Sequence, residues 1–482
     1  MFTNNRNKSF IVLCFTVLIF IIYFLTFGIG NSVQYDGEKM LNIVGIIIII
    51  QFLYSIITLL ICGVKIDNLS FIYLTFYFIF LFGQVVCRYV FGFVDEDSYD
   101  FTNDFSSTQI LQACIISLYG MITIHLGILL GVVFSRKNKI YKEVKDKDMN
   151  LKLKVMNKVA WIVVVCSAPF ALYELFDKLK IAFASGYKGV YSDITIGVES
   201  LVTKLVPFFF VALLVLMVSY KNDIKKAKKI FVIILIYNVL QFFLGARGLP
   251  ILRVLFTIIA WNLTINKITT KKMIIYFLLL IPLSILISFM RVVREYAISE
   301  WISDIGIVLN EIISNNPVLL ALNEMGIAIF PTTAALVACP EMVPFKWGTT
   351  YLYGIAAIIP NLGTELSVNK VMGDIQQEIS KVFGLAFGGS IVEDLFANFG
   401  WLCLLALIIL GIFMYKIDIR IKEKAYKSPI VIPLYLAFCV SFVWTVRNNI
   451  NPIFREFVWY ILPIYVFYKL LYRKVKKGER KT

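Results

Sequence analysis

The chain begins with an unbroken apolar run, in which residues 10–29 read FIVLCFTVLIFIIYFLTFGI. An α-helix of about 20 apolar residues is long enough to cross the hydrocarbon core of a membrane. No small-residue cleavage site follows the run, so we expect a retained helix and not a signal peptide. Similar runs recur along the 482 residues, and 59% of the chain is hydrophobic, against roughly 45–50% in an ordinary soluble domain. The sequence therefore predicts an all-α polytopic membrane protein.

The charges between the apolar runs favour about twelve transmembrane helices. The expected spans are residues 10–30, 41–62, 69–90, 109–134, 157–177, 201–220, 229–246, 248–265, 273–290, 398–416, 429–446 and 456–472. With this count, lysine-rich segments such as 136–158 and 267–272 all fall on the side of the N-terminus. Loops rich in Lys and Arg stay on the cytoplasmic side, so both termini are predicted to be cytoplasmic.

The loops also define the expected domain organisation. We expect one integral membrane domain, residues 1–482, with a large extracytoplasmic loop, residues 291–397, between the ninth and tenth spans. A loop of that length is typically functional. Its apolar stretches 318–338 and 351–359 are expected to be buried or re-entrant and not to span. The net charge of +16 is spread over short loops, which indicates anionic lipid headgroups and not nucleic acid as the charged partner.

Motifs for metals and nucleotides are absent from the sequence. It contains no Walker loop, Rossmann glycine pattern, HExxH or Gly-x-Ser-x-Gly motif, and its cysteines form no CxxC pair. The single histidine, His125, lies in a predicted span. We therefore expect neither a cofactor nor a metal site.

Arginine is enriched near the predicted outer face, where lysine is scarce. Arg247 occupies a tight Gly-Ala-Arg-Gly turn, Arg291 and Arg294 share a helix face after the ninth span, and Arg447 and Arg455 lie between the last two spans. A guanidinium group grips phosphate through two parallel hydrogen bonds. These five arginines indicate a site for a phosphorylated substrate. A plain turn, snorkelling to the interface and pairing with nearby carboxylates remain structural alternatives.

Two acidic residues of the large loop are candidates for catalysis. Glu324 lies in Leu-Asn-Glu-Met-Gly, and Glu393 lies in Gly-Gly-Ser-Ile-Val-Glu-Asp-Leu-Phe-Ala-Asn-Phe-Gly. A carboxylate among apolar neighbours suits general-base work. Either residue could instead pair with a nearby arginine.

Amide and aromatic side chains offer contacts for sugars. Asn448, Asn449 and Asn451 supply donors and acceptors that match hydroxyl groups. Trp301 could stack on a sugar ring, as could Trp347 and Tyr353.

Together these motifs resemble bacterial O-antigen or capsular polysaccharide repeat-unit polymerases of the Wzy type, from about residue 150 onward. The resemblance implies a metal-independent glycosyltransferase of the bacterial cytoplasmic membrane, with a fold related to the GT-C class. Such an enzyme transfers the growing glycan from undecaprenyl diphosphate to an incoming lipid-linked repeat unit on the outer face. Flippase and chain-length regulator proteins are the partners that the resemblance suggests.

Three other functions fit parts of the sequence. A glycan ligase would use the same chemistry with a different final acceptor. A lipid-linked oligosaccharide flippase or other transporter would be expected to carry charges near the membrane midplane in both halves of the chain. A non-catalytic assembly protein would use the large loop to bind a partner.

Overall fold

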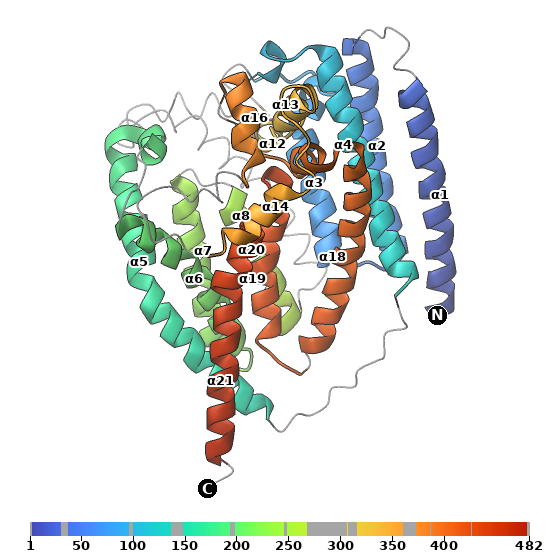
Figure 1. Cartoon of the computed structure of the whole chain (residues 1–482). Coiled ribbons are helices and arrows are strands. Elements are labelled where there is room, and N and C mark those ends of the chain that lie inside the picture. Colours follow the sequence, from blue (N-terminus) through green and yellow to red (C-terminus); the bar gives the residue numbers. More distant parts are fainter. Residues whose placement is uncertain are drawn as a thin grey trace.

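The structure is a bundle of helices with a group of shorter helices at its upper end (Figure 1). It is a computed structural model that describes residues 2–29, 37–95, 100–135, 148–192, 198–244, 248–267, 306, 316–359, 373–385, 387–425 and 427–479. All regular secondary structure in these ranges is helical. Arg247, Arg291, Arg294, Trp301 and the expected ninth span lie outside the described residues.

The first half of the chain supplies long helices. They are α1 (Phe2–Ile29), α2 (Gly37–Ile61), α3 (Leu69–Tyr89), α4 (Ser107–Val133), α5 (Met149–Ser192), α6 (Val198–Ser219), α7 (Ile224–Phe243) and α8 (Gly248–Thr264), with a 3₁₀ turn, η2 (Phe101–Asn103), before α4. In Figure 1, α1 and α5 form opposite edges of the bundle.

The second half alternates short and long helices. The short ones are α12 (Pro317–Met325), α13 (Ile329–Ala338), α14 (Thr349–Ala356), α16 (Ile375–Phe383), α17 (Ile391–Phe399), η3 (Gly400–Leu402), η4 (Thr445–Arg447), α20 (Asn451–Glu456) and η5 (Phe457–Ile461), and the long ones are α18 (Cys403–Ala425), α19 (Val431–Trp444) and α21 (Leu462–Glu479). Of these, η5 is a π-helix.

Seven helical segments of the described chain are long and apolar enough to cross a membrane. They are Asn7–Gly28, Gly37–Ile61, Leu69–Tyr89, Ser107–Val133, Met149–Ile181, Pro317–Ala338 and Ile391–Ala425. Shorter apolar helices cover Lys204–Ser219, Gly248–Thr264 and Val431–Arg447. Every expected span except 273–290 thus contains a helix, and the polytopic all-helical class is confirmed. The total of twelve stays a prediction.

The segment Pro317–Ala338 is largely apolar but is not one continuous helix. The side chain of Asn316 caps α12 by accepting hydrogen bonds from Val318 N (3.0 Å) and Leu319 N (3.3 Å). The helix ends at Gly326, where a methyl group would lie 2.1 Å from the backbone nitrogen of Gln84. This broken helix packs against α3 and is 67% buried in its most apolar window. This broken helix fits the buried element that is expected at 318–338. Its length of 22 residues is also enough to cross a membrane.

Helix α4 lies at the centre of the bundle and is the most buried of the candidate spans, whereas α1 is the least buried. Glycines let α4 and α18 approach closely. A methyl group on Gly127 would lie 2.1 Å from the carbonyl oxygen of Ile408, and one on Gly411 would lie 2.4 Å from that of Ile124. Small residues at such crossings are typical of membrane helix packing, since packing and not the hydrophobic effect drives association there.

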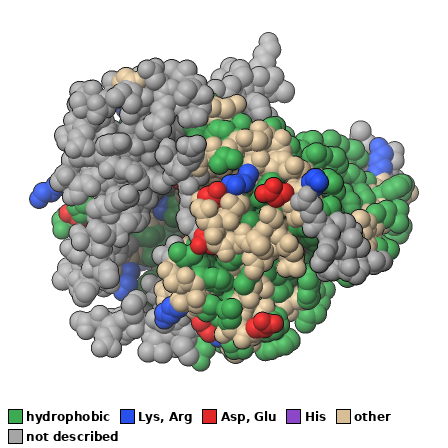
Figure 2. Space-filling model, turned by 90° about the horizontal axis from the view of Figure 1, so that it is seen from above, with side chains coloured by type: hydrophobic (Ala, Val, Ile, Leu, Met, Phe, Trp, Pro, Cys, Tyr) green, Lys and Arg blue, Asp and Glu red, His purple; other side chains and the backbone are tan. Residues whose placement is uncertain are grey.

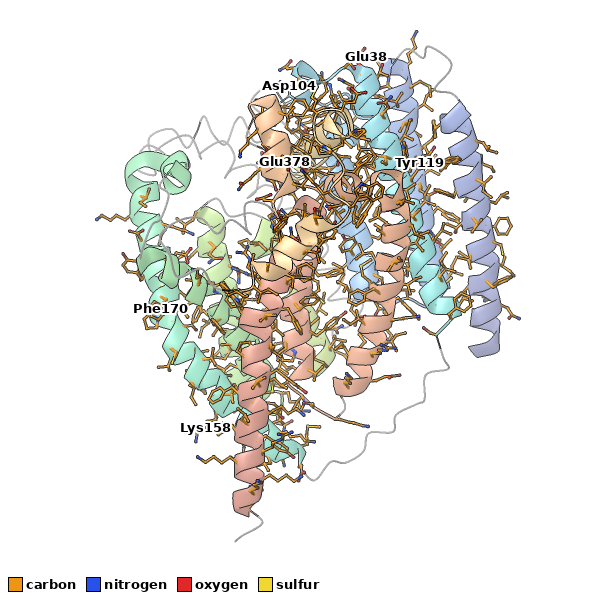
Figure 3. The ribbon with its side chains drawn as sticks, viewed as in Figure 1. Glu38, Asp104, Tyr119, Lys158, Phe170 and Glu378 are labelled. Atoms are coloured by element: carbon orange, nitrogen blue, oxygen red, sulfur yellow. The ribbon has the colours of Figure 1, made fainter. Side chains whose placement is uncertain are left out.

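Labelled charged residues mark the two ends of the bundle (Figure 3). Glu38, Asp104 and Glu378 lie at the upper end, and Lys158 lies near the lower end (Figure 3). The first residues of α1 and the last residues of α21 both point downward (Figure 1). The short helices α12, α13 and α16 are therefore at the end opposite the termini.

Candidate functional site

The N-terminus of α17 holds Glu393 in a buried, hydrogen-bonded position. The Ser390 hydroxyl accepts a hydrogen bond from Glu393 N (2.9 Å), and Ser390 N donates to Glu393 Oε2 (2.8 Å). This reciprocal pair is a capping box, which satisfies two backbone N–H groups at a helix start. A second hydroxyl, from Thr332 of α13, lies 2.7 Å from that of Ser390. One carboxylate oxygen of Glu393 is therefore structural, and Oε1 has no hydrogen-bond partner in the described structure.

Asp394 attaches α17 to the segment between the last two long helices. Its Oδ2 accepts a hydrogen bond from Ile450 N (2.9 Å), and its Oδ1 accepts one from Asn398 Nδ2 (3.2 Å). The hydroxyl of Tyr351, from α14, lies beside the same carboxyl group. A single carboxylate thus holds the 445–451 segment, which carries Arg447 and the three asparagines, against α17.

Asn398 fixes the chain that leads into α14. Its Oδ1 accepts hydrogen bonds from Gly348 N (3.1 Å) and the Thr350 hydroxyl (2.8 Å), and its carbonyl oxygen accepts one from Trp347 N (2.8 Å). Trp347 has a φ of 50°, a region that a bulky side chain rarely adopts. Its indole is nevertheless 66% exposed. Strained backbone at a well-bonded turn is often found beside functional sites.

Two of the three predicted asparagines point into the same region. Asn449 Nδ2 donates to Asp374 Oδ1 (3.3 Å), and Asn451 Nδ2 donates to the carbonyl of Gly373. The carbonyl oxygens of both side chains are buried and have no partner among the described residues. Asn448 instead accepts a hydrogen bond from Asn449 N (2.9 Å) and stabilises its own turn.

We call Tyr351, Glu393, Asp394, Asn449 and Asn451 the α17 cluster. It presents four buried side-chain oxygens that have no hydrogen-bond partner in the described structure: Tyr351 Oη, Glu393 Oε1, Asn449 Oδ1 and Asn451 Oδ1. Buried polar atoms are rarely left unpaired. A ligand rich in hydroxyl or other N–H and O–H donors would satisfy them. Within the described ranges no group of His, Cys, Asp or Glu side chains is arranged to hold a metal ion.

Two arginines lie on segments next to the α17 cluster. Arg447 ends η4, and Arg455 lies in α20, which packs against α14. Gly248, the first residue of α8, is pressed against Trp444, since a methyl group there would lie 1.9 Å from the indole ring. Arg247 directly precedes Gly248 in the chain, and Arg447 follows Trp444 by one helical turn. Two arginine-bearing segments about 200 residues apart in sequence therefore meet through their neighbours.

Arg253 is held deeper in α8. Its Nη1 donates to Gln241 Oε1 (2.7 Å), and its guanidinium lies 5.3 Å from the centre of the Phe210 ring. The carboxyl group of Glu456 is buried nearby and accepts a hydrogen bond from the Ser441 hydroxyl. These contacts favour a role for Arg253 in positioning its neighbours over a simple contact with the membrane interface.

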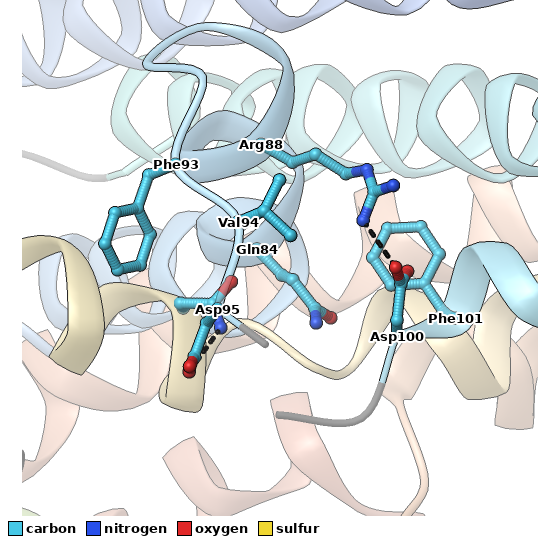
Figure 4. Close-up of a pocket in the computed structure, with 8 residues that line it drawn as sticks. Gln84, Arg88, Phe93, Val94, Asp95, Asp100 and Phe101 are labelled. Atoms are coloured by element: carbon cyan, nitrogen blue, oxygen red, sulfur yellow. Dashed lines mark hydrogen bonds and ion pairs between the residues drawn. The ribbon is translucent and has the colours of Figure 1, made fainter. Parts of the chain in front are cut away.

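Glu324 directly follows Asn323, which lines a small pocket at the end of α3 (Figure 4). The pocket is lined by Gln84, Arg88, Phe93, Val94, Asp95, Asp100, Phe101 and Asn323. Asn323 Nδ2 donates to Asp95 Oδ2 (3.4 Å), and Glu324, the next residue, is half-buried. The two predicted catalytic carboxylates are thus in separate places.

Arg88 has a local partner in that pocket. Its Nη1 donates to Asp100 Oδ2 at 2.8 Å. Burial acts to raise the pKa of Asp100, but hydrogen bonds from Thr102 and Arg88 outweigh it and lower the pKa below its usual value. Arg88 is thus held in an ion pair at the end of α3.

Seen from the upper end, acidic and basic side chains lie close together on the described surface, among hydrophobic ones (Figure 2). With its apolar helices, the structure defines a polytopic membrane protein that has a buried polar cluster near one end.

The comparison with known families is specific. A family model described as O-antigen polysaccharide polymerase Wzy matches residues 9–478, nearly the whole chain. The chain therefore belongs to the Wzy family of polysaccharide repeat-unit polymerases, and the predicted resemblance is confirmed. No curated protein and no solved structure matches it.

Several residues of the site were not predicted. Asp394 and Tyr351 were missed as members, as was the role of Asn398 as an anchor. The capping box of Ser390 and Glu393 could have been found, because Ser-x-x-Glu before an apolar run is its sequence signature. The contacts of Asp394 with Ile450 and of Asn449 with Asp374 have no local signal.

Proposed function

We propose that the protein polymerises lipid-linked repeat units of an O-antigen or capsule on the outer face of a bacterial cytoplasmic membrane, with both termini in the cytoplasm. The growing glycan would leave undecaprenyl diphosphate and join the incoming unit. Membership of the Wzy family supports the polymerase activity. The observation that supports the site is the set of four unpaired buried oxygens in the α17 cluster.

In this proposal the acceptor sugar binds at the α17 cluster. Asn449 and Asn451 accept hydrogen bonds from its hydroxyls. The reacting hydroxyl gives its proton to Glu393 Oε1 while its oxygen bonds to the anomeric carbon of the donor. The bond from that carbon to the diphosphate oxygen breaks, and the electron pair leaves with the diphosphate. Positioned proton transfer of this kind typically contributes about 10²–10⁴-fold to a rate.

Arginines would bind the leaving diphosphate. Arg447 and Arg455 lie on segments next to the cluster, and Arg247, Arg291 and Arg294 remain proposed partners on sequence grounds. Negative charge grows on the leaving group in the transition state, where fixed cationic donors are most effective. Glu324 remains the alternative base, and Trp301 and Asn448 remain proposed sugar contacts. A GT-C relationship, the flippase and the chain-length regulator are likewise proposals.

The test replaces Glu393 by Gln. Glutamine at this position keeps the capping box, because its carbonyl oxygen still accepts from Ser390 N, but it cannot take up a proton. We expect a normally folded protein with at least about a hundredfold less polymer, measured on gels of lipid-linked glycan from cells, with single repeat units accumulating on the outer face. Glu324→Gln is the matched comparison, because it makes the same substitution at the alternative base.

The outcomes separate the candidates. Normal polymer from Glu393→Gln together with a loss from Glu324→Gln would move the base to Glu324. Units that accumulate inside the cell in Arg447→Lys would favour a flippase. Unchanged polymer length in both Glu variants and in Arg447→Lys would contradict the proposed chemistry.

A further inference from the structure

Helix α14 has two chemically different faces. On its inner face, Thr350 is hydrogen-bonded to Asn398 (2.8 Å), and Gly354 is pressed against Asn451, whose Oδ1 would lie 2.2 Å from an added methyl group. On its outer face, Leu352 is 67% exposed and Ile355 is 49% exposed. One short helix therefore separates the α17 cluster from an exposed apolar surface.

Both ends of α14 are fixed. Asn398 holds the turn before the helix. After the helix, Trp459 Nε1 of the π-helix η5 donates to the carbonyl of Ile358 (2.8 Å). The exposed Ile359 follows directly and is 75% exposed. The apolar face is thus presented on an ordered element.

The helix also lies against α20, which carries Arg455. Figure 1 shows α14 directly beside α20, below α12 and α13 and level with the upper parts of the long helices. The helix is therefore at the depth of the long apolar helices, and its inner face packs against the element that carries Arg455, a cation that could bind a phosphate. An amphiphile with a charged head and a long apolar chain fits this juxtaposition.

We propose that the exposed apolar surface formed by Leu352 and Ile355 of α14, with Ile359 just after the helix, binds the isoprenoid chain of the lipid carrier while its diphosphate binds at the arginines of the neighbouring segments. This inference rests on the proposed function. A hydrocarbon chain cannot enter the α17 cluster without burying polar atoms unpaired, so it must leave the site across an apolar surface. Helix α14 is an ordered surface of that kind at the border of the cluster.

The kind of contact determines how much a substitution on this surface should weaken binding of the carrier. Lipid tails are as apolar as leucine, so packing and not the hydrophobic effect would hold the chain. The face therefore orients the carrier more than it supplies affinity. For Leu352→Gln we expect KM for the lipid-linked unit to rise about threefold, which corresponds to about 0.6 kcal/mol, with kcat little changed. Ile409→Gln on α18 is the matched control, since Ile409 is 60% exposed and lies on a different helix from the proposed contact surface.

Photo-crosslinking tests the contact directly. A diazirine amino acid is placed at position 352 or 355, and at 409 as the control, in the full-length protein. The protein is reconstituted in nanodiscs of phosphatidylethanolamine and phosphatidylglycerol with a polyprenyl-diphosphate-linked repeat unit. Intact-mass measurement identifies the adduct. We expect polyprenyl adducts at 352 and 355 and phospholipid adducts at 409.

Each other outcome overturns the inference. Phospholipid alone at 352 and 355 would show a general bilayer contact, and a peptide adduct would show that this chain or a second copy covers the face. If the unmodified protein polymerises the supplied unit while 352 and 355 capture only phospholipid, the inference fails and the proposed function stands. If it does not polymerise the supplied unit, the proposed function fails first.

Discussion

The contact between Gly248 and Trp444 gives the most direct test of how the outer segments are held together. An alanine methyl group at position 248 would lie 1.9 Å from the indole ring of Trp444. Ordinary van der Waals contact begins at about 3.4 Å, so α8 and α19 must separate by about 3.4 − 1.9 = 1.5 Å or the indole must turn away. Overpacking of this kind costs about 1–3 kcal/mol.

The effect on activity should exceed the effect on folding. Arg247 and Arg447 lie within three residues of the contact in sequence, and a misplacement of about 1 Å at an active site can reduce a rate about 10²-fold. We expect Gly248→Ala to lower the melting temperature by a few degrees and polymer synthesis by at least about tenfold. Thermal unfolding of the detergent-solubilised protein and gels of polymer length measure the two effects.

Two further variants control this experiment. Gly28→Ala places a methyl group where nothing lies within 4 Å, and we expect it to behave as wild type. Trp444→Leu removes the clashing ring atoms, so the double variant with Gly248→Ala should be no worse than Trp444→Leu alone, a non-additivity typical of residues in contact. Wild-type activity and stability for Gly248→Ala would refute the reasoning, as would a strictly additive double variant.

Three other predictions concern packing and pH. Gly127→Leu should prevent the close approach of α4 and α18, since even a methyl group would lie 2.1 Å from a carbonyl oxygen. The yield of folded protein on size-exclusion chromatography should collapse. A normal yield would show that α4 and α18 do not cross at Gly127. Asn398→Ala should remove the acceptor for Gly348 N and Thr350, which costs about 1–3 kcal/mol in thermal melts; an unchanged melting temperature would count against the anchor. Because the folded pKa of Asp100 is lowered, its stabilisation should be present above its unfolded pKa of about 3.9 and lost as pH falls through the folded pKa. Asp100→Asn should therefore lower the melting temperature more at pH 7 than at pH 3, and an equal difference at both pH values would disprove the linkage.

Much of the local structure was predictable. The run at residues 10–29 lies within α1, and helices occupy the expected spans outside 273–290. The capping box at Ser390 and Glu393 was present in the sequence as a Ser-x-x-Glu pattern. The stretch 351–359 was expected to be buried or re-entrant, and α14 is only partly buried because its outer face carries Leu352 and Ile355.

The sequence by itself determined the membrane class and the positions of most of the long helices. A helix in lipid satisfies its own backbone hydrogen bonds, so length and apolar composition suffice to define it. The tertiary structure alone decided which polar groups meet. Asp394 binds the backbone of Ile450, 56 residues away, and Gly248 contacts Trp444. Such contacts depend on how helices pack, and packing is set by shape over the whole bundle and not by any local pattern.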